Sequence, residues 1–163
     1  IAPVLSYTAE EIWQLTPSLT KQEDSVFLSN FNLENENPNS VISNNEWKRI
    51  FEIKDSVNQT IEQLRNENKL KGSLDAIVNI EVSSKDFKTL DKLGDELHFL
   101  FIASEASISE GKDLKINITI SENDKCVRCW HRDESVGNDS KHKEICHRCI
   151  TNIEKDGEQR RFI

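Results

Sequence analysis

The sequence predicts an α+β fold in three parts: helices in residues 1–72, a small α/β unit in 73–121 and a cysteine-bearing module in 122–163. Three observations predict it. One long stretch repeats apolar residues at helical spacing, and later stretches alternate apolar with polar residues as half-buried strands do. All four cysteines fall in the last quarter of the chain.

A short helix is predicted within residues 1–16. Thr8 and Glu11 match the Thr-x-x-Glu capping box that often begins a helix. Residues 17–45 form a polar connector rich in asparagine. Its short apolar run at 26–28 is expected to dock on a neighbouring surface.

The clearest helix is predicted at 46–70. Asn45 is placed to cap its start, and Gly72 to end it. The helix carries an apolar stripe with one lysine in it, which predicts packing against a core rather than a ligand site. The stripe consists of Trp47, Ile50, Phe51, Lys54, Val57, Ile61 and Leu64.

The α/β unit is predicted to hold about three strands and two helices. Alternation at 76–83 predicts a strand, after which Ser84 caps a short helix at 85–93. Residues 95–104 are expected to run from a helical turn into a buried strand. Alternation at 114–120 predicts a half-exposed strand.

Length and composition suit a soluble protein of one ordinary or two small domains, with 163 residues of which 31% are charged. No stretch approaches the roughly 20 apolar residues of a membrane helix, and no signal peptide is recognisable. We therefore expect no membrane partner and a cytoplasmic location. The chain opens with Ile1 and contains no Met, which predicts a fragment of a longer protein.

Charge is distributed unevenly. The net charge is −8, which as an average argues against a nucleic-acid partner. Residues 125–163 carry nine basic and seven acidic side chains, a net charge of +2, which leaves −10 on the remainder. A polyanion would therefore bind residues 125–163 more easily than the remainder of the chain.

Two Cys-x-x-Cys pairs separated by 16 residues carry the strongest chemical signal. Each pair can form a tight turn that points two thiolates at one ion, and two such turns supply four sulfurs at tetrahedral corners. Four protein ligands leave no open position for a catalytic water. We expect one structural Zn²⁺ in a zinc-ribbon-like module, held by Cys126, Cys129, Cys146 and Cys149.

Other interpretations of the cysteines remain open. Iron can occupy four thiolates at similar spacing. A redox Cys-x-x-Cys pair normally occurs once, at the start of a helix, so two pairs argue against it. His131, His142 or His147 can replace a cysteine ligand, but with four cysteines present each is expected to be a surface residue.

Residues 122–163, called the zinc module below, are few for independent folding. Zinc binding can supply on the order of 10 kcal/mol or more of folding free energy. The Asp-Gly pair at 156–157 predicts a turn that joins 150–153 and 159–162 as a hairpin. Arg160 and Arg161 would then lie on a terminal strand.

Both cysteine pairs read Cys-x-Arg-Cys, so Arg128 and Arg148 occupy matching places. A zinc ion with four thiolates has a net charge of about −2, which these guanidinium groups offset; contact with RNA phosphates is the functional alternative. Trp130 either stacks on an unpaired base or caps the small core, and a buried or half-buried role is favoured. The candidate RNA-binding residues are Trp130, Arg128, Arg132, Arg148, Arg160 and Arg161.

Several segments resemble one family. Residues 125–131 (KCVRCWH) and 144–149 (EICHRC) resemble the C-terminal zinc finger of bacterial isoleucyl-tRNA synthetases, which are class I enzymes. Residues 2–13 (APVLSYTAEEIW) resemble the late helices of the family's anticodon-binding domain, and 72–75 and 94–97 resemble its connecting unit. The likeness covers nearly the whole chain in family order.

This resemblance implies ATP-dependent attachment of isoleucine to tRNA(Ile) by a complete, monomeric synthetase of which this chain is a C-terminal, tRNA-binding part. The HIGH and KMSKS motifs that serve ATP and Mg²⁺ are absent, so no catalytic residue is placed here. Residues 69–73 (KLKGS) echo KMSKS but are interpreted as a helix end and turn. The family's contact with the anticodon region is carried over to Trp130 and neighbouring basic residues. His147 stands where a smaller residue is common, and its side chain is expected to point outward.

Two other functions remain open. The chain could be a stand-alone zinc-ribbon module that binds DNA or protein, because zinc fingers of some DNA glycosylases have related spacing. Those enzymes need a catalytic N-terminal residue and a lesion-binding domain, and neither is visible here. The third possibility is a purely structural C-terminal tail, in which the zinc ion only stabilises the end of the chain.

Overall fold

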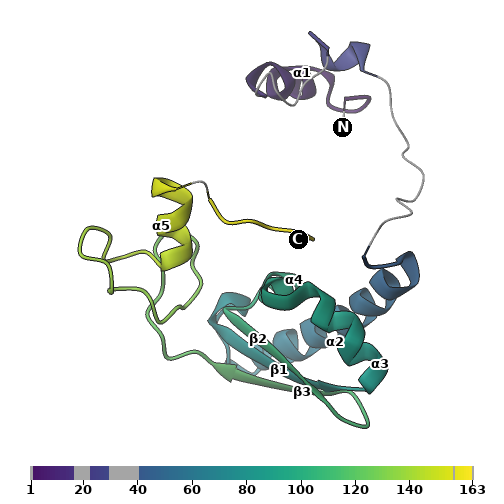
Figure 1. The fold of residues 1–163 in the computed structure, drawn as a ribbon, viewed down its shortest axis with the longest axis vertical. Helices are drawn as coiled ribbons and strands as arrows, with labels where there is room; N and C mark the ends of the chain where they lie inside the picture. Colours follow the sequence, from purple (N-terminus) through teal and green to yellow (C-terminus); the bar gives the residue numbers. More distant parts are fainter. Residues whose placement is uncertain (1, 17–22, 30–40, 156, 163) are drawn as a thin grey trace. The chain divides into compact units, whose positions relative to one another are not determined.

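A computed structural model describes residues 2–16, 23–29, 41–155 and 157–162 (Figure 1). The chain divides into two compact units, residues 1–40 and 41–163. Most of the predicted polar connector lies outside the described residues. The predicted three-domain division stays a prediction.

Helix α1 (Ser6–Leu15) begins earlier than expected. Residues 2–4 form a turn that leads directly into it, and Leu5 occupies the N-cap without a side-chain hydrogen bond. Thr8 and Glu11 therefore lie inside the helix. The predicted capping box is wrong because the preceding turn, rather than a capping side chain, leads the backbone into the helix.

A short 3-10 helix, η1 (Val26–Leu28), is held to α1 by Glu10. The Glu10 carboxylate accepts hydrogen bonds of 2.8 and 3.1 Å from residues 25–26. Phe27 and Leu28 nevertheless remain 58% and 63% exposed. Within the described residues the run docks through hydrogen bonds, and its two large apolar side chains stay largely exposed.

Helix α2 (Asn44–Asn66) begins with a complete capping box. Ser43 Oγ accepts the Glu46 N–H at 3.3 Å, and the Glu46 carboxylate accepts the Ser43 N–H at 2.8 Å. These bonds satisfy backbone donors that the first turn leaves unpaired. Asn45 is already inside the helix, so its predicted role as the cap is wrong.

The end of α2 and its buried face also differ from expectation. Asn68 takes the left-handed conformation, with φ of 56°, and the helix ends at Asn66 rather than at the predicted residue 70. The KLKGS segment lies outside the helix, so only the predicted turn, and not the helix end, falls within it. The buried side chains are Ile50, Ile53, Val57 and Ile61. Phe51 is 50% exposed and lies beside this stripe, because Ile53 completes the buried face instead.

A three-stranded mixed sheet lies next to α2. Its strands are β1 (Ala76–Val82), β2 (Glu105–Glu110) and β3 (Lys115–Ile120), in the order β2-β1-β3. The central strand β1 runs parallel to β2 and antiparallel to β3. Its even-numbered residues are buried and its odd-numbered residues are partly exposed, so one face of the sheet packs inward.

Short helices cover that inward face together with α2. A 3-10 turn, η2 (Ser73–Asp75), precedes β1, and α3 (Ser84–Leu90), η3 (Asp91–Glu96) and α4 (Leu97–Phe101) follow it (Figure 1). Ser83, rather than Ser84, caps α3 by accepting the Asp86 N–H.

The predicted buried strand within 95–104 is wrong. Leu97–Phe101 is helical, and Ile102 leaves that helix with φ of 53°. The strand comes later, as β2, whose side chains are largely exposed because it pairs with β1 at a sheet edge. No apolar run marks it in the sequence.

Residues 41–121 are called the α/β core below. Their buried apolar side chains form one cluster drawn from α2, β1, α3, η3, α4 and the segments that connect them. No described helix is long and apolar enough to cross a membrane.

Candidate metal centre

The first cysteine pair is shaped by a tight backbone turn. The Trp130 N–H donates to the Cys126 carbonyl at 2.9 Å, and the Cys126 N–H donates to the His131 carbonyl at 2.9 Å. Trp130 has φ of 68°, the left-handed conformation that closes the turn. The turn directs both thiol groups of the pair, Cys126 and Cys129, to one side.

The second cysteine pair begins helix α5 (His147–Glu154). Cys146 occupies the N-cap and Cys149 lies in the first turn. The Cys146 N–H donates to Cys126 Sγ at 3.4 Å, which joins the two pairs directly. α5 occupies the place of the predicted 150–153 and 159–162 hairpin, so the hairpin is wrong and Arg160 lies in irregular structure.

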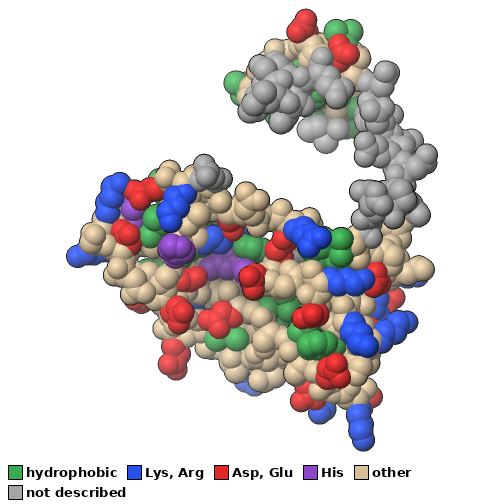
Figure 2. Space-filling view, viewed as in Figure 1, with side chains coloured by type: hydrophobic (Ala, Val, Ile, Leu, Met, Phe, Trp, Pro, Cys, Tyr) green, Lys and Arg blue, Asp and Glu red, His purple; other side chains and the backbone are tan. Residues whose placement is uncertain are grey.

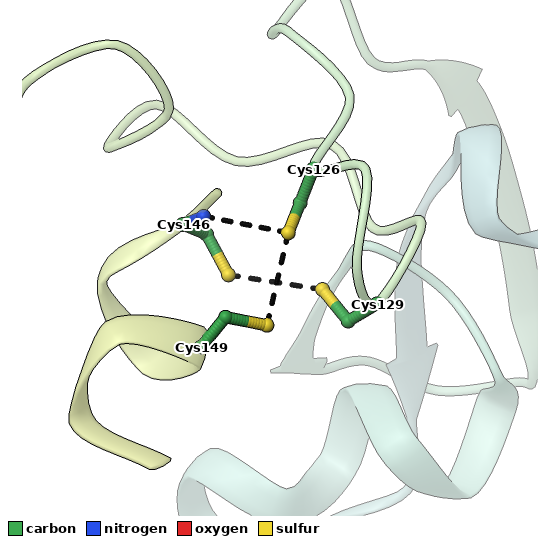
Figure 3. Close-up of side chains that lie close together, drawn as sticks. All are labelled: Cys126, Cys129, Cys146 and Cys149. Atoms are coloured by element: carbon green, nitrogen blue, oxygen red, sulfur yellow. Dashed lines mark hydrogen bonds between the residues drawn. The ribbon is translucent and has the colours of Figure 1, made fainter. Parts of the chain in front are cut away.

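The four cysteines converge on one point (Figure 3). Two Sγ–Sγ distances, Cys126 to Cys149 and Cys129 to Cys146, are both 3.7 Å, and all four sulfurs lie within 4.8 Å of one another. Zn–S bonds of about 2.3 Å at tetrahedral angles place the sulfurs about 3.8 Å apart. Disulfide sulfurs would be about 2.05 Å apart, so the geometry fits one shared ion.

The surroundings shift the pKa values of the cysteines in different directions, lowering that of Cys126 and raising those of Cys146 and Cys149. Burial opposes ionisation of Cys126, but hydrogen bonds from the backbone of Cys129, Cys146 and Arg128 outweigh it and lower its pKa to about 6. Burial raises the pKa of Cys146. Arg128 Nη1 lies 3.5 Å from Cys149 Sγ, and this bond raises the pKa of the guanidinium.

The second arginine of the matched pair behaves similarly. Burial opposes the charge of Arg148, whereas a hydrogen bond to the Cys129 thiolate raises its pKa. Both arginines therefore face the sulfurs from the places that the repeated Cys-x-Arg-Cys pattern predicts.

Histidines stay outside the sulfur cluster among the residues that the structure describes. His142 Nε2 lies 3.0 Å from Glu154, and His147 is exposed, as expected for surface residues. His131 differs from expectation, because it is half-buried and its Nε2 has no hydrogen-bond partner in the described part of the chain. Burial, and next the charge of Arg148, lower its pKa.

Four of the six candidate RNA-binding residues are exposed, and Arg160 is one of them although it also contacts Phe99. Trp130 is 61% exposed, so its favoured buried or half-buried position is wrong; the left-handed turn points it away from the small core. Lys125 Nζ lies 5.4 Å from its ring. Arg128 and Arg161 are also exposed.

Arg132 lies at the joint between the zinc module and the α/β core. Its Nε lies 2.7 Å from Asp75 Oδ1, and its Nη1 donates to the Asn123 carbonyl at 2.9 Å. Its backbone N–H donates to Ser104 Oγ at 2.6 Å. The bonds to Asp75 and Ser104 fix the module on the α/β core, a role that sequence reasoning missed because Asp75 is 57 residues away.

Arg148 and Arg160 gather on the ring of Phe99 in α4. Their Cζ atoms lie 4.9 and 3.9 Å from its centroid. Glu158 accepts from both guanidinium groups, at 3.3 Å from Arg148 and 2.7 Å from Arg160. Basic side chains are interspersed with acidic ones on the face seen in Figure 2.

Comparison with known proteins agrees with this geometry. Residues 1–81 match the anticodon-binding domain of tRNA ligases, and residues 123–152 match the zinc finger found in FPG and IleRS. The chain is 38% identical to the isoleucine–tRNA ligases of Hahella chejuensis and Shewanella sediminis and 36% identical to that of Dichelobacter nodosus. Each alignment covers 99% of this chain.

The chain belongs to the isoleucine–tRNA ligase family. It spans 17–19% of the length of these relatives, and so corresponds to a part of an isoleucine–tRNA ligase. The zinc-finger family includes FPG proteins as well as IleRS. The match to the anticodon-binding domain of tRNA ligases on the same chain favours IleRS. The zinc-finger match and the four converging cysteines together support zinc binding.

Proposed function

We propose that this chain is the tRNA-binding part of a cytoplasmic, monomeric isoleucine–tRNA ligase. The complete enzyme would use ATP and Mg²⁺, in a catalytic domain outside this chain, to attach isoleucine to tRNA(Ile). The observation that supports the proposal is the presence, in one chain, of an anticodon-binding match and a zinc-finger match whose cysteines converge.

Cys126, Cys129, Cys146 and Cys149 would hold one structural Zn²⁺ in this proposal. The ion would fix the turn that carries Trp130 and the start of α5. Arg128 and Arg148 would neutralise the charge of the thiolates, at the positions where they already approach the sulfurs.

RNA contact would centre on Trp130. Its exposed ring can stack on an unpaired base, and Arg128 and Arg161 can meet phosphates. Arg132, Arg148 and Arg160 were predicted for the same role. Their bonds to Asp75, Glu158 and Phe99 support a framework role, and of the three only Arg160 is also exposed.

The test uses Cys146→Ser in the complete ligase, with His147→Ala as the matched control on the neighbouring exposed residue. Cys146→Ser is expected to lose zinc and tRNA charging while keeping isoleucine-dependent ATP–pyrophosphate exchange, because the ion supports RNA binding rather than activation. His147→Ala is expected to keep all three. Equal loss of exchange and charging in Cys146→Ser would contradict the proposal.

Binding of DNA by the zinc module is the second candidate, since its family description also names FPG. Competition between a tRNA(Ile) transcript and a DNA duplex of equal charge separates the two. Equal competition by the duplex would favour the DNA-binding function.

A further inference from the structure

An aromatic groove of about 370 Å³ opens between α2, α4 and the C-terminal segment. The Trp47 and Phe51 rings stack with centroids 5.8 Å apart and an interplanar angle of 28°. Phe51 is 50% exposed. The groove is lined by Trp47, Phe51, Lys54, Phe99, Leu100 and Phe162.

Packing of the α/β core accounts for Trp47, Leu100 and Phe162 but not for the exposed Phe51 ring. The buried face of α2 is complete without Phe51, because Ile50 and Ile53 on either side are at most 1% exposed. Four aromatic side chains around one opening form a contiguous apolar surface, which in soluble proteins often marks a binding site.

Two cations stand at the aromatic rings of the groove. Lys54 Nζ lies 6.0 Å from the Phe51 centroid, and Arg161 Cζ lies 5.3 Å from the Phe162 centroid. Neither cation forms a salt bridge with another described residue, whereas Arg148 and Arg160 nearby both pair with Glu158. The groove therefore offers aromatic faces beside two cations that form no salt bridge within the described residues, with the Glu96 carboxylate bound to the backbone of Arg161 and Phe162 nearby.

The groove is continuous with the zinc module through Phe99. One ring lines the groove and also contacts Arg148, which faces the sulfur cluster. The C-terminal segment is anchored here as well, because the Phe162 N–H donates to Glu96 at 2.8 Å. A strand of RNA on the zinc module would thus lie within reach of the groove.

We propose that this groove binds one unpaired nucleotide of the RNA, its base stacked on Phe51 and its phosphates facing Lys54 and Arg161. Aromatic faces hold any base, and nearby cations match the phosphates. An apolar protein segment would fill the groove but leave both cations without a counter-charge. This inference rests on the proposed tRNA-binding function.

The experiment measures the Kd of the complete ligase for a tRNA(Ile) transcript. Phe51→Leu removes the aromatic face but keeps apolar volume, and it is expected to weaken binding about tenfold. Phe51→Tyr keeps the ring, and Phe27→Leu alters an exposed phenylalanine of the other unit; both are expected to stay within about twofold of the wild type. Zinc content and the unfolding midpoint should not change.

Lys54→Gln provides a second test, the salt dependence of tRNA binding, and leaves the aromatic rings of the groove unchanged. It is expected to lower the slope of log Kd against log salt concentration by about one, as loss of one phosphate contact does.

Wild-type affinity in a folded Phe51→Leu variant would overturn the inference. A lower unfolding midpoint of the complete ligase in that variant, with unchanged tRNA affinity, would instead identify the groove as a docking surface for protein. In either case, loss of tRNA binding by Cys146→Ser alone would leave the proposed function standing.

Discussion

The α/β core and the zinc module differ in what their interiors contain. The core buries sixteen apolar side chains in one cluster, whereas the module's described interior holds Ile145 and Ile150 with three buried cysteines. A cluster of the first kind stabilises its fold by removing apolar surface from water. The interior of the zinc module is too small to stabilise a fold in this way, so folding of the module depends on the metal ion that the four sulfurs would bind. Removal of the metal should therefore destabilise the zinc module alone, and a cavity in the apolar cluster should destabilise the α/β core alone.

Removing zinc with a chelator is expected to have the largest effect. The module should lose on the order of 10 kcal/mol of metal-linked folding free energy and unfold, while the α/β core keeps its structure. Residue-resolved NMR spectra of the chain would show loss of dispersion for α5 and unchanged signals for β1. If the amides of α5 stayed protected from hydrogen exchange without metal, the zinc module would not depend on the ion for folding, and the proposed difference from the α/β core would be wrong.

Ile50→Ala is expected to have the opposite regional effect. Ile50 is fully buried, so the cavity should lower the free energy of unfolding of the α/β core by about 2–5 kcal/mol. Urea unfolding followed by far-UV circular dichroism measures this, and zinc content should stay at one ion per chain. The control Phe27→Ala alters an exposed side chain and should change the free energy by less than about 0.5 kcal/mol. Zinc loss in Ile50→Ala would contradict the separation.

Arg132→Ala tests the joint between the two regions. Asp75 would lose the partner of a carboxylate that is only 15% exposed, at a cost of about 1–3 kcal/mol. A double-mutant cycle with Asp75→Asn should show that the two losses are not additive. The exposed Lys143→Ala serves as control. Additive losses in the cycle would show that the ion pair does not join the regions.

Glu46→Gln should give the smallest effect, about 1 kcal/mol, because glutamine can keep the capping-box bond but removes the charge that pairs with Lys92 and stabilises the start of α2. Hydrogen bonds from Lys92 first, then from Ser43, lower the pKa of Glu46 from 4.5 to about 2. Since the folded pKa is the lower one, the stabilisation is complete above pH 4.5 and disappears as the pH falls toward 2.

Urea unfolding of wild type and Glu46→Gln across this pH range measures the effect, and their difference should shrink as the pH falls. Glu62→Gln, at a largely exposed pair with Arg65, is the control and should change the free energy by a few tenths of a kcal/mol. A pH-independent difference at position 46 would show that ionisation of its carboxylate does not stabilise α2.

Local patterns predicted much of this fold. The apolar stripe of α2 and the apolar–polar alternation of β1 and β3 predicted these three elements correctly. A half-buried helix or strand repeats apolar residues with its own period. β2 escaped notice because its side chains, as in EASISE, are mostly polar or small at an exposed sheet edge. The N-caps were misplaced by one to three residues, since Ser, Thr and Asn cluster at several candidate starts.

The spacing of four cysteines and the repeated Cys-x-Arg-Cys pattern by themselves determined a shared metal centre with two neutralising arginines. That chemistry is local, because two residues between thiols allow one ion to be held by one turn. Only the tertiary structure decided that Trp130 is exposed, that Arg132 joins the module to the α/β core, and that an aromatic groove opens beside α2. Those outcomes depend on contacts between residues far apart in the chain, which no local period or spacing encodes.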